Sequence, residues 1–145
     1  VIIVARGNPK NVSSLADLLR ADVRVALGNP DACQIGRITG RIFEQVGLKA
    51  PLADARLALT VNELGVWVKM GSADAAIVWD AIAANIARDV EKVEIPREQN
   101  VISRVVVGIL KTSENPAAAR RFVKFLTSDR GQSILREMGY RAEAP

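Results

Sequence analysis

The 145-residue sequence contains no histidine and only one cysteine. The absence of histidine excludes Ser-His-Asp triads and the usual histidine-containing zinc sites, and a lone cysteine cannot form a disulfide within the chain. No apolar run approaches the roughly 20 residues that a membrane-spanning helix needs. Aromatic residues make up only 4% of the chain, so the position of each tryptophan is informative.

The composition is that of a globular domain with a basic balance. Hydrophobic residues make up 49% and charged residues 25%, which is an ordinary proportion for one folded domain. The net charge is +4 and the isoelectric point is near 9.6. The Lys and Arg residues are scattered, without an aromatic-interleaved basic tract, which favours a solvated basic surface and argues against nucleic-acid binding.

Hydrophobic periodicity predicts alternating strands and helices. The predicted strands cover 1–6, 23–27, 55–59, 74–79, 92–96 and 102–110. The predicted helices cover 13–20, 35–46, 61–70, 80–89 and 114–128, and a last helix follows in "SDRGQSILREMGY". This alternation predicts an α/β fold in which helices flank a mostly parallel sheet.

The first strand-to-helix junction that draws attention is "ALGNPDACQIGR". The strand ends at Leu27, a Gly-Pro loop follows, and a helix begins near Gln34 or Ile35. Because Gly36 has no side chain, a ligand could approach the first turn of this helix closely. An ordinary connecting loop explains the same residues, and neither a G-x-G-x-x-G nor a P-loop pattern is present, so nucleotide binding is not indicated.

The second junction is "LTVNELG", in which Thr60 and Glu63 match the capping box S/T-x-x-E/Q. A capping box would satisfy the amides of Thr60 and Glu63 and leave those of Val61 and Asn62 without a partner in the helix. Two free amides and the positive end of the helix dipole form an anion site. The alternative is that water occupies these amides.

The third junction is the end of the predicted strand 74–79, where Trp79 precedes Asp80. An indole N–H at the end of a strand can donate to a ligand oxygen. The alternative is that Trp79 only covers the core, and Asp80 is expected to cap the next helix. Because ligands of open α/β sheets bind beyond the carboxyl ends of the strands, the three junctions together predict a site for a small oxyanion. Such a site needs no catalytic residue, no cofactor and no metal ion held by side chains of the protein.

The order of "VALGNPDACQIGR", "TVNELGVWVKMGSADAAIVWDA" and "ENPAAARRFVKFLTSDRGQSILREMGY" resembles the periplasmic molybdate/tungstate-binding proteins of ABC importers, over nearly the whole chain. In that family a G-D-P loop precedes a helix, a "GEADAGIVY"-like strand follows, and an "NPEAARAFLDFLLSPEGQAIFARYGF"-like segment closes the chain. The resemblance implies a type II periplasmic-binding-protein fold of two α/β lobes, with the oxyanion between them. It assigns 1–108 to the second lobe with hinge strands at both ends, and 109–145 to helices that return toward a first lobe largely missing from this chain.

The resemblance also implies a ligand set and partners. Ile35 and Val61 fall at positions whose backbone amides bind the oxyanion, and Trp79 falls at the position of a ligand-contacting tyrosine. Gln34, Gly36 and Asn62 are the neighbouring candidates, and Gln34-Ile35 stands where the family commonly has small residues. The implied ligand is molybdate, tungstate or a similar oxyanion, the implied partners are the membrane subunits of an importer, and the implied location is periplasmic or otherwise extracytoplasmic.

The sequence leaves two alternative functions open and predicts one further property. A ligand-sensing domain of a transcriptional regulator would have the same fold, but would need a helix-turn-helix that this sequence lacks. An enzyme would have to use Cys33, whose thiol lies near a helix start, with Glu, Asp or Lys as its base. Self-association is expected from the apolar faces of the last two helices, formed by Phe122, Phe125, Leu126, Ile134, Leu135 and Met138.

Overall fold

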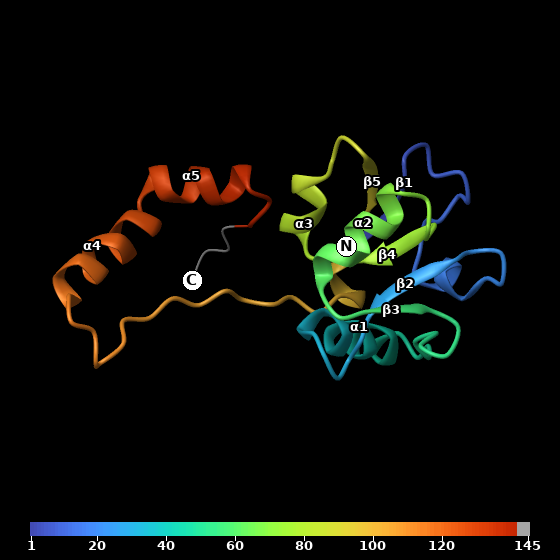
Figure 1. The fold of residues 1–145 in the computed structure, drawn as a ribbon, viewed down its shortest axis with the longest axis horizontal. Coiled ribbons are helices and arrows are strands. Elements are labelled where there is room, and N and C mark those ends of the chain that lie inside the picture. The colour runs from blue at the N-terminus through green and yellow to red at the C-terminus, as the bar shows by residue number, and fades with distance from the viewer. Residues whose placement is uncertain (142–145) are drawn as a thin grey trace. The chain divides into compact units, whose positions relative to one another are not determined.

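The computed structural model of the chain describes residues 1–141. The chain divides into two compact units, Val1–Val101 and Ile102–Pro145, shown in Figure 1. The first unit contains a sheet with helices on its faces, and the second contains two helices. Among the described residues, no helix combines the length and the apolar character needed to cross a membrane.

A five-stranded sheet with the order β3-β2-β4-β1-β5 forms the centre of the first unit. The strands are β1 (Ile2–Ala5), β2 (Val25–Gly28), β3 (Arg56–Ala58), β4 (Ala75–Ile77) and β5 (Val90–Val93). β2 pairs in parallel with β3 and β4, whereas β1 is antiparallel to β4 and β5. Four strands therefore run in one direction and β1 runs in the other, so the predicted mostly parallel sheet is confirmed with β1 as its exception.

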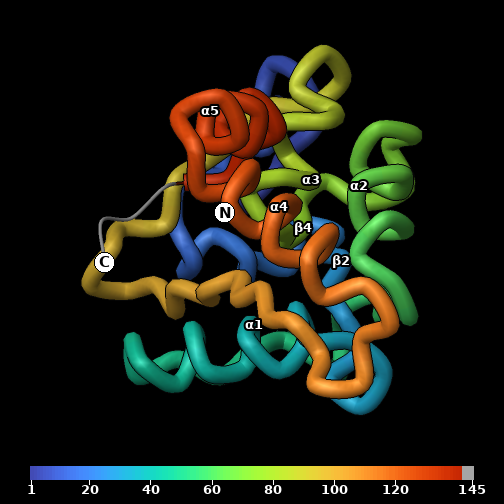
Figure 2. The backbone as a smooth tube through the Cα atoms, turned by 90° about the vertical axis from the view of Figure 1, so that its left-hand side faces the viewer, coloured from blue at the N-terminus to red at the C-terminus, as the bar shows by residue number. Residues whose placement is uncertain are grey.

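Helices cover both faces of this sheet. α1 (Gln34–Gln45) lies on one face, and α2 (Val61–Lys69) and α3 (Asp80–Asn85) lie on the other, as Figures 1 and 2 show. The strand order explains the arrangement. The connection through α1 leads from β2 to its neighbour β3. The connection through α2 leads in the opposite direction, from β3 past β2 to β4. Because such connections are right-handed, opposite directions place their helices on opposite faces.

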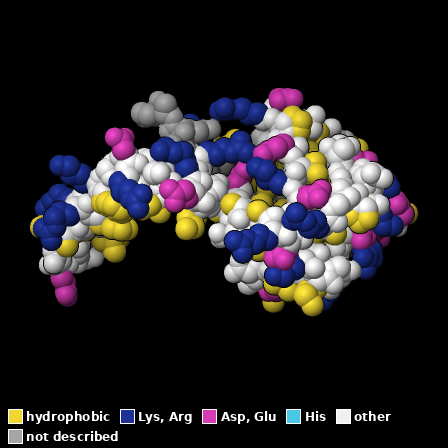
Figure 3. Space-filling view, turned by 90° about the horizontal axis from the view of Figure 1, so that it is seen from above, with side chains coloured by type: hydrophobic (Ala, Val, Ile, Leu, Met, Phe, Trp, Pro, Cys, Tyr) yellow, Lys and Arg dark blue, Asp and Glu magenta, His cyan; other side chains and the backbone are white. Residues whose placement is uncertain are grey.

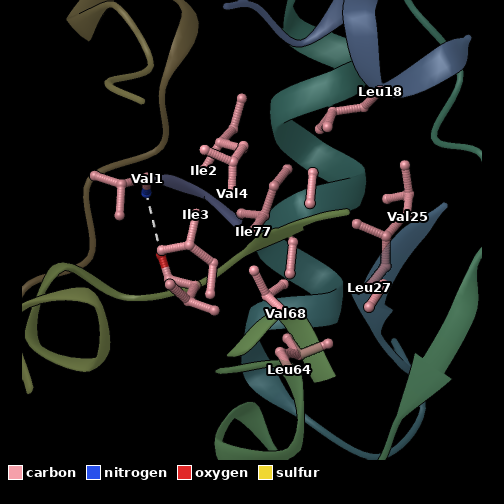
Figure 4. Packing of buried hydrophobic residues seen from close by; sticks show 14 of the residues in the cluster. Val1, Ile2, Ile3, Val4, Leu18, Val25, Leu27, Leu64, Val68 and Ile77 are labelled. Atoms are coloured by element: carbon pink, nitrogen blue, oxygen red, sulfur yellow. Dashed lines mark hydrogen bonds between the residues drawn. The ribbon is translucent and has the colours of Figure 1, made fainter. Parts of the chain in front are cut away.

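The core lies between the sheet and these helices. Ile2, Ile3 and Val4 are all at most 1% exposed, although successive strand residues point to opposite faces. Both faces of β1 are therefore buried, as expected for a sheet with helices on each side. Figure 4 shows these side chains among Leu27, Leu64, Val68 and Ile77, and the amino group of Val1 donating to the carbonyl of Val78 at 3.1 Å.

The second unit contains α4 (Pro116–Leu126) and α5 (Asp129–Glu137). Both helix starts follow the sequence rules. The side chain of Asn115 accepts a hydrogen bond from the amide of Ala118 at 3.1 Å, with Pro116 at the first helical position. The hydroxyl of Ser128 accepts from the amide of Gly131 at 3.3 Å. The caps and the missing proline donor fix where each helix begins.

Two predicted elements differ in the structure. Residues 102–110 form no strand, and Val105 and Val106 are more than 80% exposed. Their β-branched composition fits a strand only where a neighbouring strand supplies hydrogen bonds and burial, and no strand of the described residues pairs with them. The predicted helix 13–20 is a short 3-10 turn, Ala16–Leu19, because the Asp17 carboxylate accepts hydrogen bonds from the amides of Ser13 and Ser14 and so organises a turn there.

Candidate functional site

The starts of α1 and α2 meet at one edge of the sheet. β2 ends at Gly28 and β3 ends at Ala58, and the two strands are parallel neighbours in register at these residues. The amide of Asn29, directly after β2, donates to the carbonyl of Ala58 at 2.8 Å. The loops that lead into α1 and α2 are therefore joined at their base, at the carboxyl ends of the strands where open α/β sheets bind ligands.

The first turn of α1 has no side-chain cap. Its N-cap residue is Cys33, whose thiol donates to the carbonyls of Asn29 at 3.5 Å and Ala58 at 3.8 Å. The amide of Gly36 donates to the carbonyl of Cys33 at 3.2 Å. Within the described residues, the amides of Gln34 and Ile35 have no acceptor. Gln34 is exposed and Ile35 is buried, so the helix start offers two backbone donors without a charged side chain.

Gly36 has a packing reason of its own. A Cβ at this position would come within 2.6 Å of the carbonyl carbon of Asn29 and 2.7 Å of that of Gly28. Gly28 is constrained in the same way, because its Cβ would lie 2.7 Å from the Cys33 sulfur. The two glycines let the first turn of α1 pack directly on the end of β2. The absence of a side chain at Gly36 is thus explained by close backbone packing, with or without a ligand.

The capping box predicted at the start of α2 is wrong. Thr60 is the N-cap residue, but its side chain accepts no amide hydrogen bond. Its hydroxyl donates instead to the Glu63 carboxylate at 2.8 Å. Because the two side chains satisfy each other, neither binds the backbone. Among the described residues, the amides of Val61 and Asn62 have no acceptor, as expected, and the amide of Glu63 joins them.

Trp79 stands between β4 and α3 as the N-cap residue of α3. Its side chain is partly buried against the core, and within residues 1–141 its indole N–H has no hydrogen-bond acceptor. Asp80 is the first residue of α3 and not its N-cap, which corrects the expected capping role. A carboxylate in the first turn still complements the helix dipole.

Sequence reasoning missed two features on the same face of the sheet. The Arg56 guanidinium stacks on the Trp67 ring at 3.9 Å from its centroid. This contact between β3 and α2 matches no sequence motif. An open pocket of about 260 Å³ lies between α2 and α3. Of the six predicted site residues only Asn62 lines it, and its other lining residues are Gly65, Val66, Lys69, Ile82, Asn85 and Ile86.

The described residues contain no side-chain cluster that could bind a metal ion. No group of three or more His, Cys, Asp or Glu side chains among them is close enough to hold a metal ion. The Cys33 thiol contacts two backbone carbonyls, and no carboxylate or lysine is recorded within hydrogen-bond distance of it among those residues. The site consists of neutral donors, which suits an anion.

Comparison with known proteins finds molybdate-binding proteins, and also a thiosulfate-binding protein of Pseudomonas aeruginosa that is 27% identical, covering 92% of this chain and 47% of that protein. The molybdate-binding protein ModA of Mycobacterium tuberculosis is 33% identical over 141 residues, which are 97% of this chain and 52% of that protein. The substrate-binding domain of a putative molybdenum ABC transporter from Clostridium difficile superimposes with a TM-score of 0.76 at 27% identity, covering 99% of this chain and 63% of that one. The Azotobacter vinelandii periplasmic molybdate-binding protein superimposes with a TM-score of 0.70 at 17% identity, covering 99% and 64%.

These proteins are solute-binding proteins and not enzymes, and the fold of the first unit is that of a periplasmic-binding-protein domain. The chain spans about half the length of the curated relatives it matches. The family model for bacterial extracellular solute-binding proteins matches residues 1–141. The chain therefore belongs to the bacterial extracellular solute-binding proteins.

Proposed function

We propose that this chain forms part of the substrate-binding component of an ABC importer and binds a tetrahedral oxyanion, molybdate or tungstate. One observation carries the proposal. The starts of α1 and α2 both lack side-chain caps, and their loops are joined at the same sheet edge by the bond from Asn29 to Ala58. Uncapped amides at two helix starts concentrate hydrogen-bond donors and partial positive charge at one place.

The donors are those that a fully deprotonated dianion needs. The proposed contacts are the amides of Ile35 and Val61 and the indole N–H of Trp79, with Gln34, Gly36 and Asn62 beside them. All are neutral, so the anion is held without a salt bridge. The names of the relatives support the choice of ligand, because the Mycobacterium tuberculosis protein is named for molybdate and the Clostridium difficile protein for molybdenum transport.

The organisation of the whole protein is part of the proposal. Because the chain spans about half of its relatives' length, we assign 1–108 to one ligand-binding lobe with hinge segments at its ends. Residues 109–145 then form helices that pack on the other lobe, whose contribution completes the site. The proposed protein works in the periplasm or an equivalent extracytoplasmic space and delivers its anion to the membrane subunits of the importer.

Thermal unfolding with different oxyanions tests the function. Molybdate and tungstate are expected to stabilise the protein by about 2.7 kcal/mol at a hundredfold excess over Kd. Phosphate is expected to stabilise it less, because its monoanion carries a proton that needs an acceptor and the site has only donors. The proposal is contradicted if no tetrahedral oxyanion raises the melting temperature of the protein, with both lobes present.

A further inference from the structure

The net positive charge of the chain comes from its second unit. Residues 1–101 contain 12 basic and 12 acidic residues, whereas residues 102–145 contain eight basic and four acidic residues. The first unit is therefore neutral by formal charge, and the second carries the whole net charge of +4. A charge imbalance of this kind in one small unit indicates a surface for an anionic partner.

Within the second unit, α4 carries a basic face. Arg120, Arg121 and Lys124 share one side of the helix by their spacing. Phe122 and Leu126 lie on the opposite side, and Phe125 borders the basic side next to Arg121. All three basic residues are exposed. Figure 3 shows Lys and Arg side chains gathered over α4 at the left of the view, and hydrophobic side chains on another side of this unit.

The charges of this face are not compensated within the described residues. No ion pair there engages Arg120, Arg121 or Lys124; the recorded ion pairs involve residues between Lys10 and Glu94. Of the acidic residues of the unit, Glu137 accepts a hydrogen bond from Ser133 at 3.1 Å, and Glu114 and Asp129 lie outside α4. The basic face is therefore available to an outside anion.

We propose that this face of α4, formed by Arg120, Arg121 and Lys124, binds the anionic phospholipid surface of the membrane that holds the importer. The face is one side of a single helix with three exposed cations, which matches an extended surface of phosphate groups. Basic side chains on an amphipathic helix bind anionic lipids in this way, and each strengthens binding about five-fold. The location follows from the extracellular family and does not depend on which anion the protein transports.

Sedimentation with lipid vesicles tests this inference. The full chain is expected to bind vesicles that contain phosphatidylglycerol at low salt, and not vesicles of pure phosphatidylcholine. Binding should disappear at about 1 M salt, where the Debye length falls to about 3 Å. Replacing all three residues together (Arg120→Gln, Arg121→Gln and Lys124→Gln) should weaken binding to the phosphatidylglycerol vesicles about 100-fold.

The matched control removes three exposed basic residues from the first unit, by Arg41→Gln, Lys49→Gln and Arg88→Gln, and should leave vesicle binding within a few-fold of the parent because net charge alone is not the cause. Equal weakening by both triple variants would overturn the assignment to α4. Binding to phosphatidylcholine that survives high salt would also overturn it, since the apolar face would then be the contact. No binding to either vesicle, with the melting temperature of the parent chain intact, would likewise overturn it and leave the oxyanion proposal standing.

Discussion

The two tryptophans of the chain lie in different environments. The Trp67 ring packs against the core from α2 and is covered by the Arg56 guanidinium. Trp79 lies at the carboxyl end of the β4 strand, before α3, and within residues 1–141 its indole N–H has no acceptor. At the scale of single residues, Trp67 has a packing role, whereas Trp79 keeps a free donor at the edge of the sheet where the proposed anion binds.

Tryptophan fluorescence separates these roles. When oxyanion is titrated into the binding-competent protein, the signal should persist in Trp67→Phe and largely vanish in Trp79→Phe. Loss of one N–H donor to a charged ligand should also weaken binding by roughly 1.5–3 kcal/mol. A Trp79→Phe variant that binds as tightly as the parent would show that Trp79 only covers the core.

The positions of the candidate site residues could be predicted from the sequence, but the packing and hydrogen bonds around some of them could not. Hydrophobic periodicity placed the strand ends and helix starts near Ile35, Val61 and Trp79, and the resemblance to the molybdate/tungstate-binding proteins indicated these three residues as ligand contacts. The sequence could not indicate that Gly36 is required by the approach of α1 to β2, since that approach depends on tertiary packing. The sequence also could not indicate that the Thr60 hydroxyl donates to the Glu63 carboxylate instead of accepting from a backbone amide.

At the scale of elements, one ion pair joins the amino ends of β2 and β4, opposite to the proposed site. The Asp74 carboxylate accepts hydrogen bonds from the Arg24 guanidinium at 2.7 and 3.1 Å and from the Arg24 amide at 2.8 Å. In the other direction, the amide of Asp74 donates to the Arg24 carbonyl at 2.8 Å. The Asp74 side chain is only 10% exposed. The hydrogen bonds from the Arg24 side chain lower the pKa of the Asp74 carboxyl below its ordinary value.

This pair predicts a pH-dependent stability. Because the folded-state pKa of Asp74 is depressed, its contribution is present above the unfolded pKa of about 3.9 and is lost as pH falls through the folded value. Urea unfolding at pH 6 should show Asp74→Ala less stable than the parent by about 2 kcal/mol, since charged hydrogen bonds are removed. Below the folded pKa the difference should shrink, and a difference that stays constant down to that pH would contradict the assignment.

The order of strands and helices in the first unit could be predicted from the sequence, and the pairing of strands only in part. The alternation of strands and helices predicted the parallel strands β2, β3 and β4. No local sequence pattern indicated that β1 lies antiparallel between β4 and β5. The strand predicted at 102–110 failed for the same reason. Strand propensity reports a fit to a partly buried pleated surface, and whether a neighbour exists is decided by the rest of the chain.

At the scale of the whole molecule, the second unit exposes apolar surface. Phe122, Phe125 and Met138 are each more than 40% exposed, and Val105 and Val106 more than 80%. Contiguous exposed apolar surface marks an interface. We therefore predict that the 145-residue chain self-associates when it is expressed without the other lobe. Light scattering at increasing concentration should show the mean mass rising, and a strictly monomeric chain at high concentration would contradict this.

Backbone amides at two helix starts, together with one indole, are the proposed donors to the oxyanion. Chemical-shift mapping on the ¹⁵N-labelled protein measures these donors directly as molybdate is added, with phosphate as the matched control. The largest perturbations are expected at the amides of Ile35, Val61 and Asn62 and at the Trp79 indole, with smaller changes for phosphate. Perturbations confined to the pocket between α2 and α3 or to the basic residues of α4, or none at any of these donors, would contradict this assignment.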